Sequence, residues 1–300
     1  MKRLVLLDGH AVLFRAFHAM PGFTAPDGSP SGAIYGFANV LIRILRELEP
    51  AYMLACFDAP GRTFRDEIYA EYKGTRAETP PDLILQEPKV KDLLTAFGVP
   101  HMALPGFEAD DLLATVAGQA LAGGQVDEVV IATGDRDLLQ LADHAVKIYL
   151  LRSGVKDIEL LDGAGVTKLL GLPPEDILDW KALRGDPSDN IIGVPGVGDK
   201  TALQLIKDFG SLDELYRQLT TGTHPSIRPR IAAALVECKD RVYQNKELLT
   251  LRHDAPVQFD PDAATRADYQ PEVARAFLKA CGFHSILDRV PGAPTQKSLF

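Results

Sequence analysis

The chain has 300 residues, of which 46% are hydrophobic and 24% are charged, and this composition excludes a wholly disordered protein. Its apolar runs are too short to span a membrane, and the amino terminus reaches Asp8 too early for a secretory signal, so we expect a cytoplasmic protein without a membrane segment. The three cysteines are far apart, which argues against disulfides and against a zinc site. A net charge of −9 argues against a nucleic-acid binder, unless the carboxylates gather around metal ions.

Short apolar runs alternate with helical patterns up to about residue 165. The runs typical of strands are Leu4–Leu7, Met53–Phe57, Val129–Ala132 and Val146–Leu151. The stretches with helical periodicity are Ala33–Glu47, Lys89–Ala96, Asp110–Ala122 and Asp137–Leu141. This alternation predicts an α/β core over residues 1–165, in which helices cover both faces of a central, mainly parallel sheet.

The strand signals fade after about residue 165, and residues 166–290 are predicted to be mainly helical. The predicted helices are Val166–Leu170, Pro174–Leu183, Lys200–Phe209, Leu212–Leu219, Pro229–Leu249 and Pro271–Ala280. Residues 291–300 are expected to form a flexible tail. Segment 59–92 follows one strand and precedes a helix, but it is far longer than the usual connection of ~2–6 residues. Its interleaved basic and aromatic side chains favour a binding loop.

Three of the apolar runs end in aspartate, at Asp8, at Asp58 and at the pair Asp135 and Asp137. In an open parallel sheet, ligands bind beyond the carboxyl ends of the strands. A single aspartate at such a place is commonly a turn former or a helix cap. Three cases on one sheet edge favour a shared function.

Further acidic groups stand at the starts of other elements. Glu108, Asp110 and Asp111 open a helix, where the helix dipole alone could favour them, and Asp186 and Asp189 lie in a segment with the composition of a turn. The nine candidate metal ligands are Asp8, Asp58, Glu108, Asp110, Asp111, Asp135, Asp137, Asp186 and Asp189. An all-oxygen set suits Mg²⁺ or Mn²⁺. So many carboxylates suit two ions ~3.5–4 Å apart, the arrangement that hydrolyses phosphodiesters by in-line displacement.

A glycine-rich segment, Gly193-Val-Pro-Gly-Val-Gly-Asp-Lys200, precedes a predicted helix. Gly196 and Gly198 would let the backbone approach a phosphate, and Lys200 would add positive charge. The segment lacks the spacing of a Walker A loop. It resembles the hairpin of helix-hairpin-helix elements, which hold duplex backbone without reading sequence; an ordinary glycine-capped turn is the alternative.

The motifs together resemble the bacterial and phage 5′-nucleases of the flap endonuclease superfamily, most closely the 5′–3′ exonuclease domains of bacterial DNA polymerases I. The matching strings, in order over about residues 2–290, are Asp8-Gly-His with Arg15-Ala-Phe, Phe57-Asp-Ala with Thr63-Phe-Arg, Tyr72-Lys-Gly-x-Arg76, Gly106-Phe-Glu-Ala-Asp-Asp111, Thr133-Gly-Asp-Arg-Asp137 and Gly185-Asp-Pro-Ser-Asp-Asn190. The resemblance implies a PIN-like nuclease core with a helical arch at about 62–100, and a helical DNA-binding region with a helix-hairpin-helix at about 185–210. It also implies a monomer that cleaves branched or 5′-flap DNA in primer removal, replication and repair.

The resemblance also implies roles for individual residues. Asp8, Asp58, Glu108 and Asp110 would serve a first metal region, and Asp111, Asp135, Asp137, Asp186 and Asp189 a second. Lys73 and Arg76 would contact the phosphate at the scissile bond, with help from Arg15. Tyr72 would either stack on a base or simply pack in the fold, and Arg65 would contact DNA. Gly196, Gly198 and Lys200 would grip duplex DNA with the help of K⁺.

The last five residues, Gln296-Lys-Ser-Leu299-Phe300, are similar to the peptide by which bacterial replication proteins dock on the sliding clamp, and clamp binding would favour a stand-alone nuclease.

Three rival functions remain for the chain. A haloacid-dehalogenase phosphatase would need an acid where His10 stands, and a PIN-like RNase would lack the helical region. A DNA-junction-binding module without activity would need no such set of carboxylates.

Overall fold

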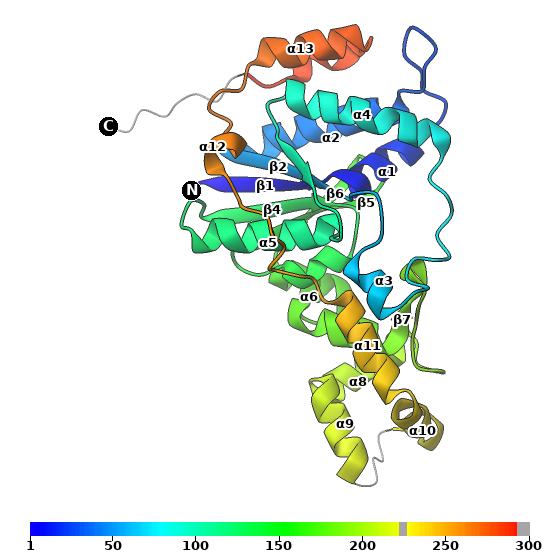
Figure 1. Cartoon of the computed structure of the whole chain (residues 1–300). Coiled ribbons are helices and arrows are strands. Elements are labelled where there is room, and N and C mark those ends of the chain that lie inside the picture. The colour runs from blue at the N-terminus through cyan, green and yellow to red at the C-terminus, as the bar shows by residue number, and fades with distance from the viewer. Residues whose placement is uncertain (222–226, 293–300) are drawn as a thin grey trace.

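The computed structural model describes residues 1–221 and 227–292, and its centre is a six-stranded sheet with the order β3-β2-β1-β4-β5-β6 (Figure 1). The strands are β1 (Arg3–Asp8), β2 (Tyr52–Phe57), β3 (His101–Ala103), β4 (Glu128–Thr133), β5 (Val146–Ser153) and β6 (Asp157–Leu161). Strands β1 to β5 pair in parallel, and β6 is antiparallel to β5. The predicted α/β fold with a mainly parallel sheet is confirmed. Strands β3 and β6 escaped prediction because they are partly exposed edge strands without a continuous apolar run.

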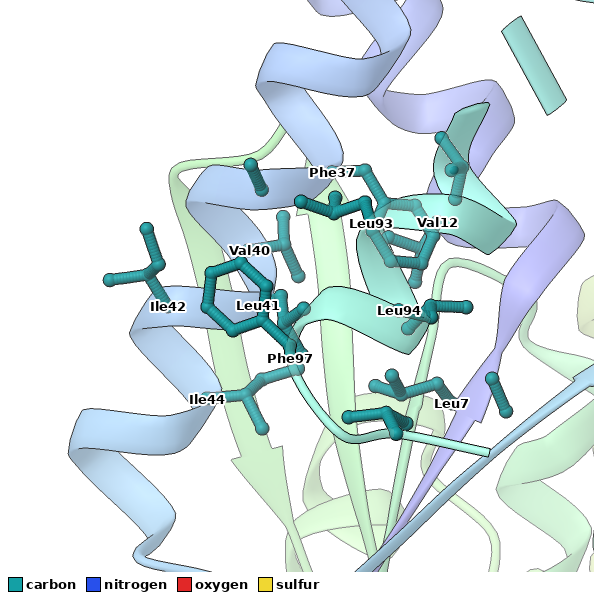
Figure 2. Packing of buried hydrophobic residues seen from close by; sticks show 14 of the residues in the cluster. Leu7, Val12, Phe37, Val40, Leu41, Ile42, Ile44, Leu93, Leu94 and Phe97 are labelled. Carbon is teal, nitrogen blue, oxygen red and sulfur yellow. The ribbon is translucent and has the colours of Figure 1, made fainter. Parts of the chain in front are cut away.

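Alternate residues of each central strand pack against opposite layers of helices. Val5 and Leu7 of β1 join one apolar cluster, whereas Leu4 and Leu6 join another. Helices α1 (Gly9–Ala19), α2 (Gly32–Leu48) and α4 (Pro81–Ala96) cover the first face, and α5 (Ala109–Ala122) covers the second (Figure 1). Figure 2 shows the first cluster, with Leu7 among Val12, Phe37, Leu41, Leu93, Leu94 and Phe97. Burial on both faces explains why these strands are uniformly apolar in sequence.

A second lobe is helical and has its own apolar cluster, built around residues such as Val194, Leu205 and Val242. Its elements are α7 (Ile177–Arg184), β7 (Gly185–Asp186), η3 (Pro187–Asp189), β8 (Ile191–Ile192), α8 (Asp199–Phe209), α9 (Leu212–Thr221), α10 (Pro229–Glu237) and α11 (Lys239–Leu249). Helix α6 (Gly163–Leu170) belongs to the sheet lobe, because its Val166 is buried in the same apolar cluster as Leu4 and Leu6. The helix expected over Pro229–Leu249 is two helices, since the backbone departs from helical geometry at Cys238.

The end of the chain returns to the first lobe. Helices α12 (Pro261–Ala264) and α13 (Pro271–Ala280) and the 3₁₀ helix η4 (His284–Arg289) follow α11, and α13 lies against α4 (Figure 1). Leu278 and Phe283 are buried in the first apolar cluster. The region expected as one helical unit over 166–290 is therefore shared between two lobes, because α13 finds its apolar partners on α4. The residues proposed for clamp binding, Gln296, Leu299 and Phe300, lie outside the described residues.

The segment expected as a helical arch, at about 62–100, contains α3 (Phe64–Ile68), a series of turns, an extended stretch and α4 (Figure 1). Helix α4 is packed on the sheet through its apolar side chains, so only the part before α4 is called the arch segment below. Its turns are docked on the second lobe by main-chain contacts. The amide of Lys73 donates to the carbonyl of Asp189 at 2.9 Å, and Asn190 Nδ2 donates to the carbonyl of Glu71 at 2.8 Å. Within the described ranges, no helix is long and apolar enough to cross a membrane.

Candidate active site and nucleic-acid interface

The carboxyl edge of the sheet carries Asp8, Asp58 and Asp135. Asp8 closes β1 and caps α1, since its Oδ1 accepts from the amide of Ala11 at 3.0 Å. Its Oδ2 accepts from the Thr133 hydroxyl at 2.6 Å, which ties the ends of β1 and β4 together. Asp58 directly follows β2, and its Oδ1 accepts from the amide of Ala109 at 2.8 Å. The central position of β1 between β2 and β4 thus brings three strand-end aspartates to one place.

Helix α5 adds two more carboxylates at its amino terminus. Glu108 is the N-cap residue and forms a capping box with Asp111. Asp110 lies in the first turn, and burial together with the charges of Asp8 and Asp135 raises its pKa well above the ordinary value. The capping geometry therefore fixes the helix start so that Asp110 faces the strand-end aspartates.

Three adjoining hollows connect the carboxylates. The first has a volume of about 210 Å³ and is lined by Asp8, Asp58, Glu108, Asp110 and Asp135. The second is smaller; Asp137 and Asp189 join its wall. The third, a cleft of about 520 Å³ toward α8, is lined by Asp135, Asp137 and Asp186. Asp135 lines all three hollows, so every predicted carboxylate except Asp111 belongs to one continuous group, called the acidic cluster below.

Crowding and burial disfavour the charged form of several carboxylates in this cluster. Burial raises the pKa of Asp8 to about 7. Burial also raises the pKa of Asp137 to about 6, even though the neighbouring Lys181 lowers it. These carboxylates would hold protons unless positive charge compensates them. The all-oxygen donor set fits hard dications such as Mg²⁺ or Mn²⁺. As the side chains lie, however, no three His, Cys, Asp or Glu residues in the described part of the chain converge in metal-binding geometry.

Basic side chains form ion pairs with several carboxylates of the acidic cluster. Lys73 Nζ lies 2.6 Å from Glu108 Oε1, and Arg76 lies 2.6 Å from Asp189 Oδ1, so both residues expected at the scissile phosphate line the predicted site. Lys181 of α7 is 4% exposed and pairs with Asp137 and with Asp186, the latter at 2.6 Å. Sequence reasoning missed Lys181, although a lysine on the apolar face of a predicted helix was an available signal.

Asp111 lines none of the three hollows, and Arg65 lines only the second, where its guanidinium is engaged by Asp111. Asp111 is fully buried, and Arg65 donates to its two oxygens at 2.7 and 2.9 Å. Asp111 also accepts from the amides of Glu108 and Arg252, so its oxygens are already engaged. Arg65 is 1% exposed and donates to the carbonyl of Leu248 at 2.8 Å. The pair therefore stabilises the fold from a buried position. We leave Asp111 out of the candidate ligands and Arg65 out of the DNA contacts.

Two further predicted residues have buried or main-chain partners. Tyr72 is 7% exposed, and its hydroxyl lies 3.1 Å from Asp189 Oδ2 and 3.3 Å from Glu108 Oε2. This position agrees with the packing alternative for Tyr72 and leaves no face of the ring for a base. Arg15 donates to the carbonyls of Gly134 and Arg152, each at 3.0 Å, and lines a hollow of about 440 Å³ beside Asp135.

The glycine-rich hairpin lies between α7 and α8, as expected. A Cβ on Gly193 would approach the carbonyl carbon of Arg184 to 2.2 Å, so two backbone segments cross here at a distance that only glycine allows. Buried Val194 and Val197 anchor the hairpin in the helical lobe. Gly196, at φ +83°, and Gly198 are exposed at the tip, and Lys200 is exposed in the first turn of α8. The main-chain amides at this helix start can therefore meet an anion.

Comparison with protein families identifies both parts of the chain. Residues 3–171 match the model described as the 5′-3′ exonuclease, N-terminal resolvase-like domain. Residues 172–272 match the model described as the 5′-3′ exonuclease, C-terminal SAM fold. The two matches together cover the sheet lobe and the helical lobe.

Curated relatives include the DNA polymerase I of Bacillus subtilis, 38% identical over 289 residues, and that of Mycobacterium leprae, 41% identical over 289 residues. Each alignment covers 96% of this chain but only 32% and 31% of the respective relative, so the chain spans about a third of their length.

Solved structures share the fold. The zinc-bound 5′-exonuclease of bacteriophage T5 matches with a TM-score of 0.67 at 21% identity, and the match covers 96% of this chain and 97% of that one. The catalytic core of Rad2 in complex with DNA substrate matches with a TM-score of 0.58 at 21% identity, over 96% and 90% of the two chains. The expected resemblance and the expected class of enzyme are thus confirmed by the family models and the curated relatives: this chain belongs to the 5′-3′ exonuclease family of nucleases.

Proposed function

We propose that the chain is a structure-specific 5′–3′ exonuclease and 5′-flap endonuclease that hydrolyses phosphodiester bonds of branched DNA. The observation that carries this proposal is the acidic cluster itself. Carboxylates at or just after the ends of β1, β2 and β4, at the start of α5, and in β7 and η3 share adjoining hollows, two of which are also lined by Lys73 and Arg76. The bacteriophage T5 flap endonuclease in complex with DNA and metal ions has the same fold, with a TM-score of 0.67 at 19% identity.

The donor set supports two or more divalent ions, Mg²⁺ or Mn²⁺, which when bound supply an activated water and stabilise charge on the scissile phosphate. Asp8, Asp58, Glu108 and Asp110 would hold the first ion region. Asp135, Asp137, Asp186 and Asp189 would hold the second. Lys73 and Arg76, which pair with Glu108 and Asp189 of the cluster, would neutralise the phosphate oxygens. Arg15 would orient the strand from the far side of Asp135.

The hairpin would hold the duplex. Exposed amides around Gly196 and Gly198, together with Lys200, can bind phosphates without reading bases, with K⁺ as the monovalent partner. The cleft of about 520 Å³ joins Lys200 to Asp135 and Asp137, so a strand gripped at the hairpin can reach the acidic cluster. The segment between α3 and α4 would confine the 5′ single strand. Removal of RNA primers and repair of flaps are the processes in which such a monomer would act.

The decisive test uses a fluorescent 5′-flap DNA with Mg²⁺ and with a chelator. We expect the wild-type chain to cut near the junction only with the metal. Asp135→Ala and Asp186→Ala should lose most cleavage while still binding the junction in the chelator. Full activity of both variants would refute their proposed role.

A DNA-junction-binding module without activity is the alternative function. The exposed hairpin and the basic arch segment would serve it equally well, but it would give no role to the acidic cluster. Binding of the flap without cleavage at any Mg²⁺ or Mn²⁺ concentration would favour this module. Cleavage of RNA in preference to flap DNA would instead favour an RNase.

The sliding clamp is a second proposed partner, through Gln296, Leu299 and Phe300. Deletion of residues 296–300 should abolish binding to the clamp and leave turnover on short flaps unchanged. Surface plasmon resonance with immobilised clamp measures the first quantity, and a flap assay without clamp measures the second. Unaltered clamp affinity would rule out this partner.

A further inference from the structure

Asp58 is the one exposed member of the acidic cluster, whereas the others are buried or half-buried. It directly follows β2 and begins an irregular segment that reaches Gly61, where φ is +116°. Neither a helix nor a strand holds the backbone of Asp58 in place. A carboxylate in such a position needs support from other elements if it is to keep one orientation.

The amide of Ala109 holds one carboxylate oxygen of Asp58, and the support for its backbone comes from His10, in the first turn of α1. The amide of Asp58 donates to His10 Nδ1 at 3.0 Å, and His10 lines the same hollow as Asp58. Because Nδ1 accepts this hydrogen bond, the ring proton belongs on Nε2. Nε2 lies 3.5 Å from Glu87 Oε2 on α4, and Lys91 Nζ lies 2.7 Å from the other oxygen of Glu87.

The imidazole is also held by its other contacts. Its edge packs on Phe57 with ring centroids 5.4 Å apart, and Lys91 Nζ lies 5.0 Å from the same Phe57 ring. A Cβ on Gly9 would come within 2.4 Å of Phe57, so the backbone before His10 is pressed against that ring. Elements α1, β2 and α4 therefore meet at His10, and their packing fixes the direction of both ring nitrogens.

We propose that His10 is a positioning residue for Asp58, and that Glu87 on α4 sets the tautomer and orientation of His10. This inference rests on the proposed function, in which Asp58 is a metal ligand. Outer partners that orient a ligand commonly change metal affinity without touching the ion. The arrangement also connects α4, at the foot of the arch segment, with the acidic cluster.

The test compares a variant that keeps a hydrogen-bond acceptor at position 10 with one that removes it. His10→Asn keeps an acceptor oxygen near the place of Nδ1, whereas His10→Leu removes both polar atoms. His144→Leu is the matched control, because His144 is exposed in the loop that precedes β5. The first readout is hydrogen exchange of the Asp58 amide by NMR without metal or DNA. The second is Mn²⁺ binding by calorimetry without DNA.

For His10→Leu we expect the Asp58 amide to exchange at least tenfold faster and Mn²⁺ to bind roughly tenfold more weakly. His10→Asn and His144→Leu should stay within about twofold of the wild type in both measurements. An unchanged Asp58 amide in His10→Leu would overturn the proposal. So would a His10→Asn variant that behaves like His10→Leu, because packing alone would then explain the effect.

The role of Glu87 is tested with the same two measurements, the exchange of the Asp58 amide and the affinity for Mn²⁺. Glu87→Gln keeps an acceptor for Nε2 and should resemble the wild type, whereas Glu87→Leu should give a smaller version of the His10→Leu effect. The double variant His10→Leu with Glu87→Leu should be no worse than His10→Leu alone, and additive losses would contradict action through His10. Asp92→Asn is the control on α4, since Asp92 pairs with Lys89.

Failure of the proposed function has a different signature. If Asp58→Asn binds Mn²⁺ as tightly as the wild type, Asp58 is not a ligand and the metal assignment fails. The exchange rate of the Asp58 amide is measured without metal, so it still decides whether His10 positions this residue.

Discussion

Arg65 and Asp111 form a buried bidentate pair in which the guanidinium lies 2.7 and 2.9 Å from the two carboxylate oxygens. The pair joins α3, at the start of the arch segment, to α5, whose first turn carries Glu108 and Asp110. It also reaches the carbonyl of Leu248 at the end of α11. One ion pair thus holds together the arch, the acidic helix start and the helical lobe.

Asp111→Asn should therefore cost stability and leave metal binding unchanged. The amide oxygen of Asn can still accept from the amide of Glu108 and keep the capping box of α5, but the buried guanidinium of Arg65 loses its counter-charge, which costs about 3–5 kcal/mol. Urea unfolding measures the loss, and Mn²⁺ calorimetry at a temperature where the variant is folded should give affinities within about twofold of the wild type. The double variant Arg65→Met with Asp111→Leu should recover part of the stability. A loss of Mn²⁺ affinity in the folded Asp111→Asn variant would restore Asp111 to the ligands.

Lys181 pairs with Asp137 and Asp186, two of the proposed metal ligands. Lys181→Met should raise the affinity for Mn²⁺ by roughly tenfold, because a fixed positive charge is removed from beside these two carboxylates. The same change should lower the stability of the metal-free protein, since the two carboxylates then lack their counter-ion. Lys181→Arg keeps the charge and is the matched control. Equal Mn²⁺ affinity in all three proteins would show that Lys181 does not set the occupancy of this region.

Lys73 should affect the cleavage step, whereas Lys200 should affect the binding of duplex DNA. Lys73→Ala should reduce turnover on flap DNA by about 10²–10³-fold with a modest change in affinity, because its contact strengthens as charge develops on the phosphate. Single-turnover cleavage and fluorescence anisotropy separate the two quantities. A Lys73→Ala variant with normal single-turnover cleavage would place Lys73 outside the chemistry.

Lys200→Ala should weaken duplex binding and reduce its dependence on salt. The slope of log affinity against log salt should fall by roughly one, as expected for the loss of one phosphate contact. Titrations of duplex DNA at several salt concentrations give this slope. Lys168→Ala is the comparison, since Lys168 is exposed on α6, outside the hairpin. An unchanged slope in Lys200→Ala would mean that the hairpin does not hold DNA through this side chain.

Glu128 at the start of β4 makes stability depend on pH. Burial would raise the pKa of Glu128, but hydrogen bonds from Lys147 and Arg3, the latter at 2.6 Å, outweigh it and lower the pKa below the ordinary 4.5. The stabilisation is therefore present above pH 4.5 and is lost as the pH falls through the lower pKa of the folded state. Glu128→Gln should lose about 1–3 kcal/mol at pH 7. The difference from the wild type should close below pH 4, and a constant difference from pH 7 to pH 3 would contradict this origin.

The amino-acid sequence was sufficient to predict the central strands of the sheet lobe and the aspartates at their ends. The runs before Asp8, Asp58 and Asp135 are apolar throughout because both faces of these strands are covered, and parallel strands deliver their carboxyl ends to one edge. The spacing of glycines between α7 and α8 likewise indicated a tight hairpin, since Gly193 packs against backbone.

The pairing of the charged side chains, in contrast, is visible only in the folded structure. Asp110 and Asp111 are neighbours in sequence, yet one turns to Asp8 and Asp135 and the other to Arg65, because successive residues of a helix point in different directions. Partners such as Lys181 with Asp186 and His10 with Glu87 come from different elements, and no local pattern records them. The burial of Tyr72 and the return of α13 to α4 were also settled by packing between segments far apart in the chain.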